Sequence, residues 1–486
     1  MSGGGAETAE ALLRRASQLR QAGRVEEAIA AYEAAIALDP RSANAWYNLG
    51  WLQRRARRFD AALASYAEAL ARGVAGPEEV HLNRAVIYAD DLARPDEAEA
   101  ELEAALALRP DYVPALLNLG NLHEDRGERA RAREAYERAV AAEPRNALAL
   151  ARLAGVAEVG GPEEPLIGRV RSALTAPSLG TDARADLGFA LGRLLDAAGS
   201  FDDAFEAYRG ANAASRAAAG VRYDPDASEA LVDGIIAAFP ERALGRSASD
   251  GSAPVFICGM FRSGSTLTEQ ILARHSKVTP GGELDLVPAL VRGRFSPYPE
   301  AASGAPQQAL EDVRRWYVDS VRRLHPGAGL VTDKRPDNFL HIGLIKAIFP
   351  EARIVHTRRD PLDNILSAWF LHLEPTMAWA LDLEDAAHWY RQYRRLMAHW
   401  EGLYRHDIHQ VDYDALVADP RSETEALLGF LGLGWEEQCL TFHEASNPVK
   451  TASAWQVREP LYRRSSGRWR HYERHLGPLR EALAGI

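Results

Sequence analysis

The first 220 residues repeat a helical pattern, and this repetition constrains the fold more than any other feature of the chain. The stretch WYNLGWLQRRARRFDAALASYAEAL (46–70) aligns with LLNLGNLHEDRGERARAREAYERAV (116–140), and HLNRAVIYADDLARPDEAEAELEAAL (81–106) lies halfway between them. The period is therefore about 35 residues, the length of one helical pair. The recurring Tyr, Leu and Ala residues are interpreted as core positions between neighbouring helices.

This pattern resembles the tetratricopeptide repeat, in which small side chains let neighbouring helices pack closely. Units that match well cover 12–40, 41–73 and 111–144, a divergent unit covers 77–110, and the match weakens over 145–217. The segment GSFDDAFEAYRGANAASR (199–216) is predicted to be a helix that closes the stack.

The repeats divide the chain into three predicted parts. An all-α repeat solenoid is expected over 1–217, a connecting helix and linker over 218–253, and a second domain over 254–486. Solenoids present concave surfaces that suit polypeptide chains, so the resemblance implies a protein or peptide partner in the groove. The alternative that the repeats form a homodimer or tether the chain to a partner stays open.

Composition and charge exclude several classes of protein. The net charge of −11 argues against a general nucleic-acid binder, which would show a basic excess. Two cysteines, Cys258 and Cys439, are too few for a disulfide framework and favour a reducing compartment. No apolar run approaches the roughly 20 residues of a membrane span, and the N-terminus lacks the order of a signal peptide. A cytoplasmic location is predicted.

Strands and helices alternate in the second domain. Short apolar strands are predicted at 255–260, 330–334, 352–358 and 408–413, with helical stretches such as 339–349, 361–373 and 384–403 between them. This order favours an α/β fold with a central parallel sheet, whose ligands bind beyond the carboxyl ends of the strands. The segment 293–310 is rich in Pro, Gly, Ser and Ala, and we expect a loop beside the site there.

The stretch GMFRSGST (259–266) follows the first of these strands. It has the spacing of the P-loop, G-x-x-x-x-G-K-[ST], but Ser265 stands where the Lys should be. Such a turn directs N–H groups at an anion, although a plain strand-to-helix turn can carry the same glycines by chance. Without the Lys that grips β- and γ-phosphates, the loop suits a single phosphate that carries a less charged group, with Arg262 beside it. Phosphosulfate fits that description.

The segment FRSGSTLTEQILARHSKVTPGGE resembles the R-S-G-T-T-L…H…G-E-E segment of the tyrosylprotein sulfotransferases, which use 3′-phosphoadenosine 5′-phosphosulfate (PAPS). His275 and Glu283 lie at the family's spacing from Arg262, and the resemblance implies that Glu283 is the catalytic base. One departure is Gly282, which replaces the first Glu of the pair. The loop residues that the resemblance assigns to PAPS are Arg262, Ser263, Gly264, Ser265, Thr266 and Leu267.

A second segment, IVHTRRDPLDNILSAWF (354–370), is similar to the one that holds the 3′-phosphate in sulfotransferases, and it implies that role for Arg359 and Ser367. Asp360 and Pro361 are typical of a helix start, so Arg359 should precede the helix and Ser367 should lie two turns into it on the same face. An arginine pair on a solvated surface is the alternative when this segment is taken alone.

Three weaker matches extend the resemblance to residue 470. TDKRPDN (332–338) places Lys334 at the catalytic Lys of the family, and VDYDALVADP (411–420) places Tyr413 near the 3′-phosphate. TASAWQVREPLYRRSSGRW (451–469) places Ser453 at a catalytic Ser and Arg468 at a cofactor-binding Lys. Arg for Lys keeps the charge but changes a point donor into a planar fork.

Together these matches identify the chain as similar to a bacterial sulfotransferase with tetratricopeptide repeats, which would move the sulfuryl group of PAPS to a hydroxyl, here protein tyrosine. Glu283 would take the proton, while Arg262, Lys334 and Ser453 would stabilise the bridging and sulfuryl oxygens. No metal is expected, because a sulfuryl group carries one negative charge where a phosphoryl group carries two. A glycan or metabolite acceptor, a P-loop kinase and a catalytically silent scaffold remain as alternatives.

Overall fold

The structure of the chain is a computed structural model that describes residues 8–177, 179–242, 253–445, 456–461 and 464–485. The chain divides into two compact units, Met1–Glu158 and Val159–Ile486. No helix in the described part of the chain is both long and apolar enough to cross a membrane.

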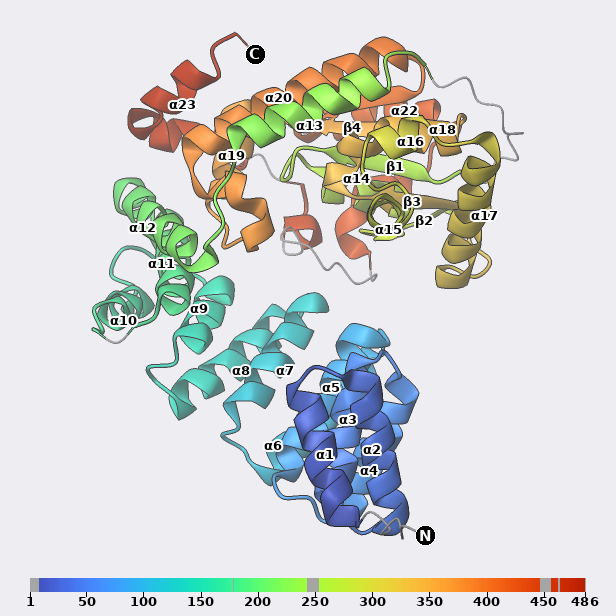
Figure 1. The fold of residues 1–486 in the computed structure, drawn as a ribbon. Coiled ribbons are helices and arrows are strands. Elements are labelled where there is room, and N and C mark those ends of the chain that lie inside the picture. Colours follow the sequence, from blue (N-terminus) through green and yellow to red (C-terminus); the bar gives the residue numbers. More distant parts are fainter. Residues whose placement is uncertain (1–7, 178, 243–252, 446–455, 462–463, 486) are drawn as a thin grey trace. The chain divides into compact units, whose positions relative to one another are not determined.

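The first unit consists of helices packed in pairs (Figure 1). Its elements are α1 (Ala9–Gln21), α2 (Val25–Leu38), α3 (Ala43–Arg55), α4 (Phe59–Ala71), α5 (Pro77–Val86), the π-helical turn η1 (Ile87–Asp91), α6 (Pro95–Leu108), α7 (Val113–Asp125), α8 (Arg129–Ala142) and α9 (Ala147–Val156). The helices of each pair from α1–α2 to α7–α8 pack against one another, and each pair contacts the next helix along the chain. The predicted all-α repeat fold is confirmed here.

A glycine on the first helix and a tyrosine on the second set the spacing within a pair. A Cβ atom on Gly50 would lie 3.0 Å from the Tyr66 ring, and one on Gly120 would lie 2.1 Å from the Tyr136 ring. Both tyrosine rings are fully buried. The recurrence of tyrosine along the sequence therefore reflects close packing of its ring on the backbone of the facing helix.

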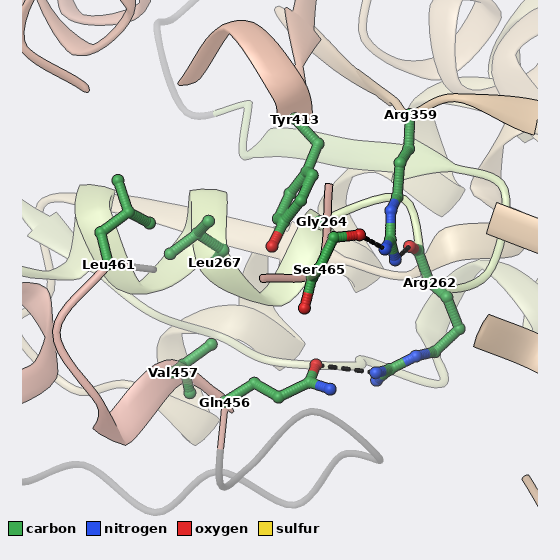
Figure 2. Close-up of a pocket in the computed structure, with 9 residues that line it drawn as sticks. All are labelled: Arg262, Gly264, Leu267, Arg359, Tyr413, Gln456, Val457, Leu461 and Ser465. Atoms are coloured by element: carbon green, nitrogen blue, oxygen red, sulfur yellow. Dashed lines mark hydrogen bonds between the residues drawn. The ribbon is translucent and has the colours of Figure 1, made fainter. Parts of the chain in front are cut away.

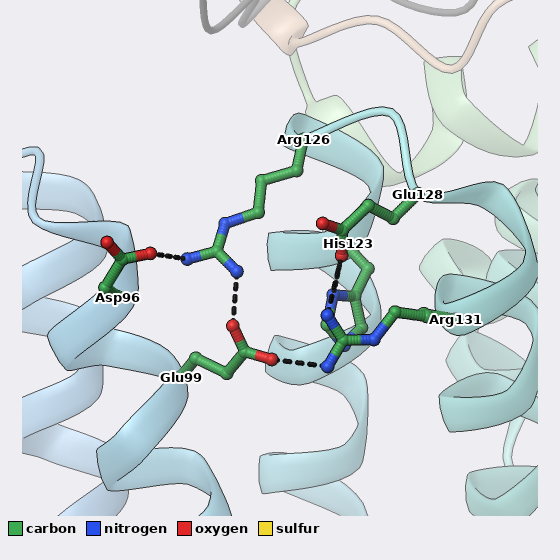
Figure 3. A network of polar contacts seen from close by, with 6 residues as sticks. All are labelled: Asp96, Glu99, His123, Arg126, Glu128 and Arg131. Atoms are coloured by element: carbon green, nitrogen blue, oxygen red, sulfur yellow. Dashed lines mark hydrogen bonds and ion pairs between the residues drawn. The ribbon is translucent and has the colours of Figure 1, made fainter.

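Charged side chains join α6 to α7 and α8, as Figure 3 shows. Arg126 pairs with Asp96 at 2.6 Å and also with Glu99, which in turn lies 2.6 Å from Arg131. The members of this network are Asp96, Glu99, His123, Arg126, Glu128 and Arg131. Burial lowers the pKa of His123, whose Nδ1 lies 2.7 Å from a Glu128 carboxylate oxygen. The network fixes the junction between two consecutive repeats.

The second unit begins with helices α10 (Pro165–Leu174), α11 (Thr181–Ala197), α12 (Phe201–Ala219) and α13 (Pro225–Ala238). The α11–α12 hairpin has the same glycine–tyrosine contact as the repeats, because a Cβ atom on Gly192 would lie 2.6 Å from the Tyr208 ring. Although its sequence groups it with the repeats, this hairpin lies in the same unit as the sheet. The domain boundaries drawn from the sequence, at 217 and 253, remain a prediction.

A five-stranded parallel sheet forms the centre of the second unit, in the order β2-β3-β1-β4-β5. Its strands are β1 (Val255–Gly259), β2 (Val278–Thr279), β3 (Leu330–Lys334), β4 (Ile354–Arg358) and β5 (Ile408–Asp412). Ile257 of β1 pairs with Lys334 on one side and with Val355 on the other. The predicted α/β fold with a central parallel sheet is confirmed. The short strand β2 was not predicted from the sequence.

Helices cover both faces of the sheet (Figure 1). They are α14 (Ser265–Ala273), α15 (Leu286–Gly293), α16 (Glu300–Ser303), α17 (Gln307–Leu324), η2 (Pro336–His341), α18 (Ile342–Ile348), α19 (Pro361–Trp369), η3 (Pro375–Leu381), α20 (Leu383–Leu403), α21 (Tyr413–Ala418), α22 (Pro420–Phe430), η4 (Glu437–Glu444), η5 (Gln456–Arg458), η6 (Arg468–His475) and α23 (Gly477–Ala482). The segment 293–310, expected to be a loop, holds the single-turn helix α16, which packs against α13 and α18, and the first turn of α17.

Candidate active site

The turn between β1 and α14 approaches neighbouring groups so closely that glycine is needed at both of its ends. Gly259 has φ +153°, and a Cβ atom there would lie 2.3 Å from the Thr357 carbonyl oxygen. Gly264 has φ +102°, and a Cβ atom there would lie 2.9 Å from the Tyr413 ring. Arg262 adopts φ +71° between them, which a non-glycine residue seldom does. The glycines and the unusual arginine backbone together form a tight turn at the start of α14.

Arg262 and Arg359 border a cavity beside this turn (Figure 2). The Nε atom of Arg262 donates to Ser367 Oγ at 3.1 Å, and its Nη2 atom donates to Gln456 Oε1 at 2.7 Å. The residues that line the cavity are Arg262, Gly264, Leu267, Arg359, Tyr413, Gln456, Val457, Leu461 and Ser465. They come from α14, from the turns after β1 and β4, from the start of α21 directly after β5, and from residues 456–465.

The guanidinium of Arg359 is held from two sides. Its Nη2 atom donates to the Ser465 carbonyl at 2.5 Å, and the group lies 4.9 Å from the centre of the Tyr413 ring. Its Nε atom is buried and finds no hydrogen-bond partner among the residues that the structure describes. A buried donor without a partner costs free energy, which an anionic ligand at this place would recover.

Glu283 and Lys334 form a separate ion pair at the carboxyl end of β3. Lys334 Nζ lies 2.7 Å from Glu283 Oε1. The lysine side chain is only 1% exposed, whereas that of Glu283 is 39% exposed. The carboxylate is therefore the end of the pair that an acceptor molecule can reach.

Glu269, on α14, ties the strand of Lys334 to the segment that carries Glu283. Its Oε1 atom accepts from Thr332 Oγ1 at 2.7 Å and from the Gly282 amide at 3.0 Å. Burial raises the pKa of the Glu269 carboxyl, and the nearby Lys334 opposes this shift. Gly282 has φ +67°, a backbone conformation that favours glycine.

Asp333 lies fully buried beside Lys334 on β3. It accepts from the Tyr317 hydroxyl, and its Oδ1 atom accepts from Asn338 Nδ2 at 3.2 Å. Burial raises the pKa of Asp333 to about 7, although both hydrogen bonds act in the opposite direction. This carboxyl is therefore a structural group beneath the site that titrates near neutral pH.

The structure gathers four of the predicted site residues, Arg262, Arg359, Ser367 and Tyr413, around one turn. Ser265 and Thr266 are buried in the first turn of α14, and Leu267 lines the cavity. Ser263 is also buried, and its hydroxyl lies 2.7 Å from that of Thr357, so it supports the sheet.

Neither Glu283 nor Lys334 is among the residues that line the cavity. Arg468 pairs with Asp196 of α11 and is not among the residues that line the cavity. Ser453 lies outside the described residues. Sequence reasoning missed Gln456, which stands inside the matched segment TASAWQVREP and was given no role there. It also missed the Ser465 carbonyl, because a backbone acceptor leaves no signal in a sequence.

No cluster of three or more His, Cys, Asp and Glu side chains suited to a metal ion occurs in the described ranges. The polar groups around the cavity are instead cationic or neutral, which matches an anionic ligand.

Comparison with known proteins places both regions in families. Residues 254–437 match a sulfotransferase family, and tetratricopeptide repeat families match 16–53, 45–78 and 91–156. An uncharacterised protein of Aquifex aeolicus (strain VF5) is 33% identical over 413 residues, which make up 82% of this chain and 52% of that protein. The chain thus spans about half the length of this relative.

Two further proteins are similar to part of the chain. A putative protein-tyrosine sulfotransferase of Caenorhabditis briggsae is 24% identical over 195 residues, covering 39% of this chain and 69% of that protein. The sulfotransferase domain from the Synechococcus PCC 7002 olefin synthase is 22% identical, with a TM-score of 0.36 over 46% of this chain and 90% of that domain. The chain thus combines N-terminal segments that match tetratricopeptide repeat families with a C-terminal region, residues 254–437, that matches a sulfotransferase family.

Proposed function

We propose that the chain transfers the sulfuryl group of PAPS to an acceptor hydroxyl, and that the acceptor is tyrosine in a protein. The observation that carries this proposal is the partly buried Arg359 guanidinium, whose Nε atom has no hydrogen-bond partner among the described residues, beside a glycine-rich turn in a region that matches a sulfotransferase family. A cationic group with an unused buried donor suits a phosphate.

The positive charge around the cavity supports an anionic donor. Arg359 and Ser367 would hold its 3′-phosphate, with Tyr413 beside the guanidinium of Arg359. The N-terminus of α14 and Arg262 would hold the 5′-phosphosulfate, because the positive end of a helix dipole favours anions. Ser265, in place of the P-loop Lys, disfavours an ATP-dependent kinase.

The ion pair would supply the chemistry. Bound PAPS presents a sulfuryl group whose transfer leaves negative charge on the departing bisphosphate. Glu283, the exposed member of the pair, would accept the proton of the attacking hydroxyl. Lys334, held by β3 and nearly inaccessible to water, would stabilise the developing negative charge without reorganisation.

The choice of tyrosine has two supports. The first is the resemblance of residues 262–283 to the tyrosylprotein sulfotransferases, and the second is the similarity to the nematode protein described as a putative protein-tyrosine sulfotransferase. Tetratricopeptide repeats would then recruit the protein acceptor, since such arrays present extended surfaces for polypeptides.

The function is tested by incubating the protein with PAPS that carries a radioactive sulfuryl group and with a cell lysate. We expect label in protein, recovered as sulfotyrosine after hydrolysis, both with and without EDTA. The same preparation should bind adenosine 3′,5′-bisphosphate much more tightly than ATP. Label in glycans or small molecules would refute the tyrosine assignment alone. A strict Mg²⁺ requirement together with preferential ATP binding would refute sulfuryl transfer and favour a kinase.

A further inference from the structure

The α11–α12 hairpin packs against the C-terminal segment 464–475 through aromatic rings. Phe201 stacks on His471 and Phe205 stacks on His475, each with ring centres 4.3 Å apart. Tyr472 is fully buried between these elements. A hairpin that looks like a further repeat in the sequence is therefore part of the packing of the sulfotransferase domain.

Asp196, in the last turn of α11, accepts hydrogen bonds from two side chains of this segment. They are the guanidinium of Arg468 and the hydroxyl of Tyr472. The Asp196 side chain is only 13% exposed, and Arg468 also lies 5.4 Å from the centre of the Phe370 ring. Since a buried carboxylate without partners is strongly unfavourable, these groups hold one another in a single arrangement.

The same segment reaches the candidate donor site at its other end. The amides of Gly467 and Trp469, on either side of Arg468, donate to Asp363 of α19 at 2.5 and 2.7 Å. The Ser465 carbonyl accepts from Arg359 at 2.5 Å. A continuous path of hydrogen bonds and backbone thus leads from Asp196 to the guanidinium of Arg359.

We propose that Asp196 is a positioning residue for the donor site, which it serves by anchoring segment 464–475 and thereby fixing the guanidinium of Arg359 for the 3′-phosphate. This inference rests on the proposed function of that site. Holding a flexible arginine in place before the ligand arrives lowers the entropy lost on binding. The hairpin consequently contributes to donor affinity although none of its residues lines the cavity.

The test compares full-length Asp196→Asn with the wild type and with a matched control, Asp203→Asn. Asp203 lies on the same hairpin and pairs with Arg171 at 2.9 Å, and both side chains are more than half exposed. Calorimetry would measure the dissociation constants of adenosine 3′,5′-bisphosphate and adenosine 5′-monophosphate. We expect Asp196→Asn to raise the dissociation constant of the bisphosphate by roughly 3- to 30-fold and to leave that of the monophosphate nearly unchanged. Asp203→Asn should change neither, and Asp196→Glu should restore part of the loss.

Hydrogen exchange without any nucleotide gives a second readout. Peptides that cover 464–470 should exchange faster in Asp196→Asn than in the wild type or in Asp203→Asn, because a segment that Asp196 no longer anchors separates the amides of Gly467 and Trp469 from Asp363 more often. An unchanged exchange rate in 464–470, or an equal loss of affinity for both nucleotides, would overturn the positioning role. Wild-type protein that binds neither nucleotide would instead overturn the proposed function, and with it the assignment of Arg359 to a 3′-phosphate.

Discussion

The ion pair of Glu283 and Lys334 is asymmetric, and the asymmetry decides which member can meet an acceptor. Lys334 belongs to β3, is 1% exposed and is held by its backbone, whose amide donates to the Gly282 carbonyl at 2.9 Å. Glu283 projects from a turn and keeps 39% of its side chain accessible. A proton acceptor must reach the proton that it removes, so the glutamate fits this role and the lysine does not.

We expect Glu283→Gln to lower kcat by roughly 10²-fold or more while leaving the affinity for adenosine 3′,5′-bisphosphate nearly unchanged. The amide keeps the shape of the side chain but cannot take a proton. Initial rates at saturating PAPS, together with calorimetric binding, would measure the two effects. Glu481→Gln, on the exposed surface of α23, serves as the control. Turnover within a few-fold of the wild type would remove Glu283 from the mechanism.

Individual side chains differ in how well their neighbourhood could be predicted. Four residues stand in segments whose motif can be recognised in the sequence, and the structure brings them together: Arg262, Arg359, Ser367 and Tyr413. Arg468 also stands in a segment with a recognisable motif, but it pairs with Asp196, which lies far earlier in the chain. No local spacing reveals a contact of that kind, and the predicted contact of Arg468 with the donor stays a prediction.

At the scale of elements, strand prediction succeeded where a buried apolar run is long enough to be distinguished from a turn. The strands β1, β3, β4 and β5 each have five residues and lie within or beside the predicted ranges. Strand β2 has two residues, too few to show any periodicity. Helix α16 has four and stands in a stretch rich in Pro and Gly, so only its packing against α13 and α18 reveals it as an element.

Strand β3 carries a buried carboxyl whose ionisation should affect stability. The pKa of Asp333 is raised by burial to about 7, so the folded state holds this proton more tightly than the unfolded state does. Stability should therefore fall as pH rises from about 4 to 7, the window between the unfolded and folded pKa values. We expect Asp333→Asn to increase the free energy of unfolding by about 2–3 kcal/mol more near pH 8 than near pH 5.

Urea unfolding of the wild type and of Asp333→Asn at the two pH values would measure this difference. The asparagine can still accept from Tyr317. If the Asn338 amide turns over, the asparagine can also donate to Asn338 Oδ1, a buried atom that has no hydrogen-bond partner in the described structure. Asp319→Asn, on the exposed face of α17, is the control. An equal loss of stability at both pH values would show that Asp333 is ionised throughout and is needed as a hydrogen-bonded carboxylate.

At the scale of the whole molecule, the α11–α12 hairpin shows what a repeat pattern can and cannot predict. Its helix pairing follows from the same contact of glycine with tyrosine as in the first unit, here between Gly192 and Tyr208. The pattern reports how the two helices pack on each other, but it carries no information on the surface that the pair then covers. Here that surface includes Trp369 and Tyr472 of the sulfotransferase domain, which contact Phe205.

This packing determines where the chain should be cut to test acceptor recruitment by the repeats. Removing residues 1–217 would delete Asp196 and Phe205 and expose the rings of Trp369 and Tyr472, so loss of activity would say nothing about recruitment. Removing residues 1–158 keeps the second unit whole. If the repeats recruit a protein acceptor, this shorter chain should show a raised KM for that protein and an almost unchanged rate on a short tyrosine peptide, since remote contacts supply binding rather than chemistry.

Steady-state kinetics on the two acceptors would measure the effect, after bisphosphate affinity has shown that the donor site of the shorter chain is intact. A matched control is the full chain with Arg131→Ala, which perturbs the charged network of the repeats while leaving the second unit untouched (Figure 3). Because that network fixes the junction of two repeats, the substitution should raise the KM for the protein acceptor in the same direction and by less than truncation does. A shorter chain that sulfates the full-length protein with an unchanged KM would leave the repeats without a role in recruitment, and their surface would then serve dimerisation or tethering.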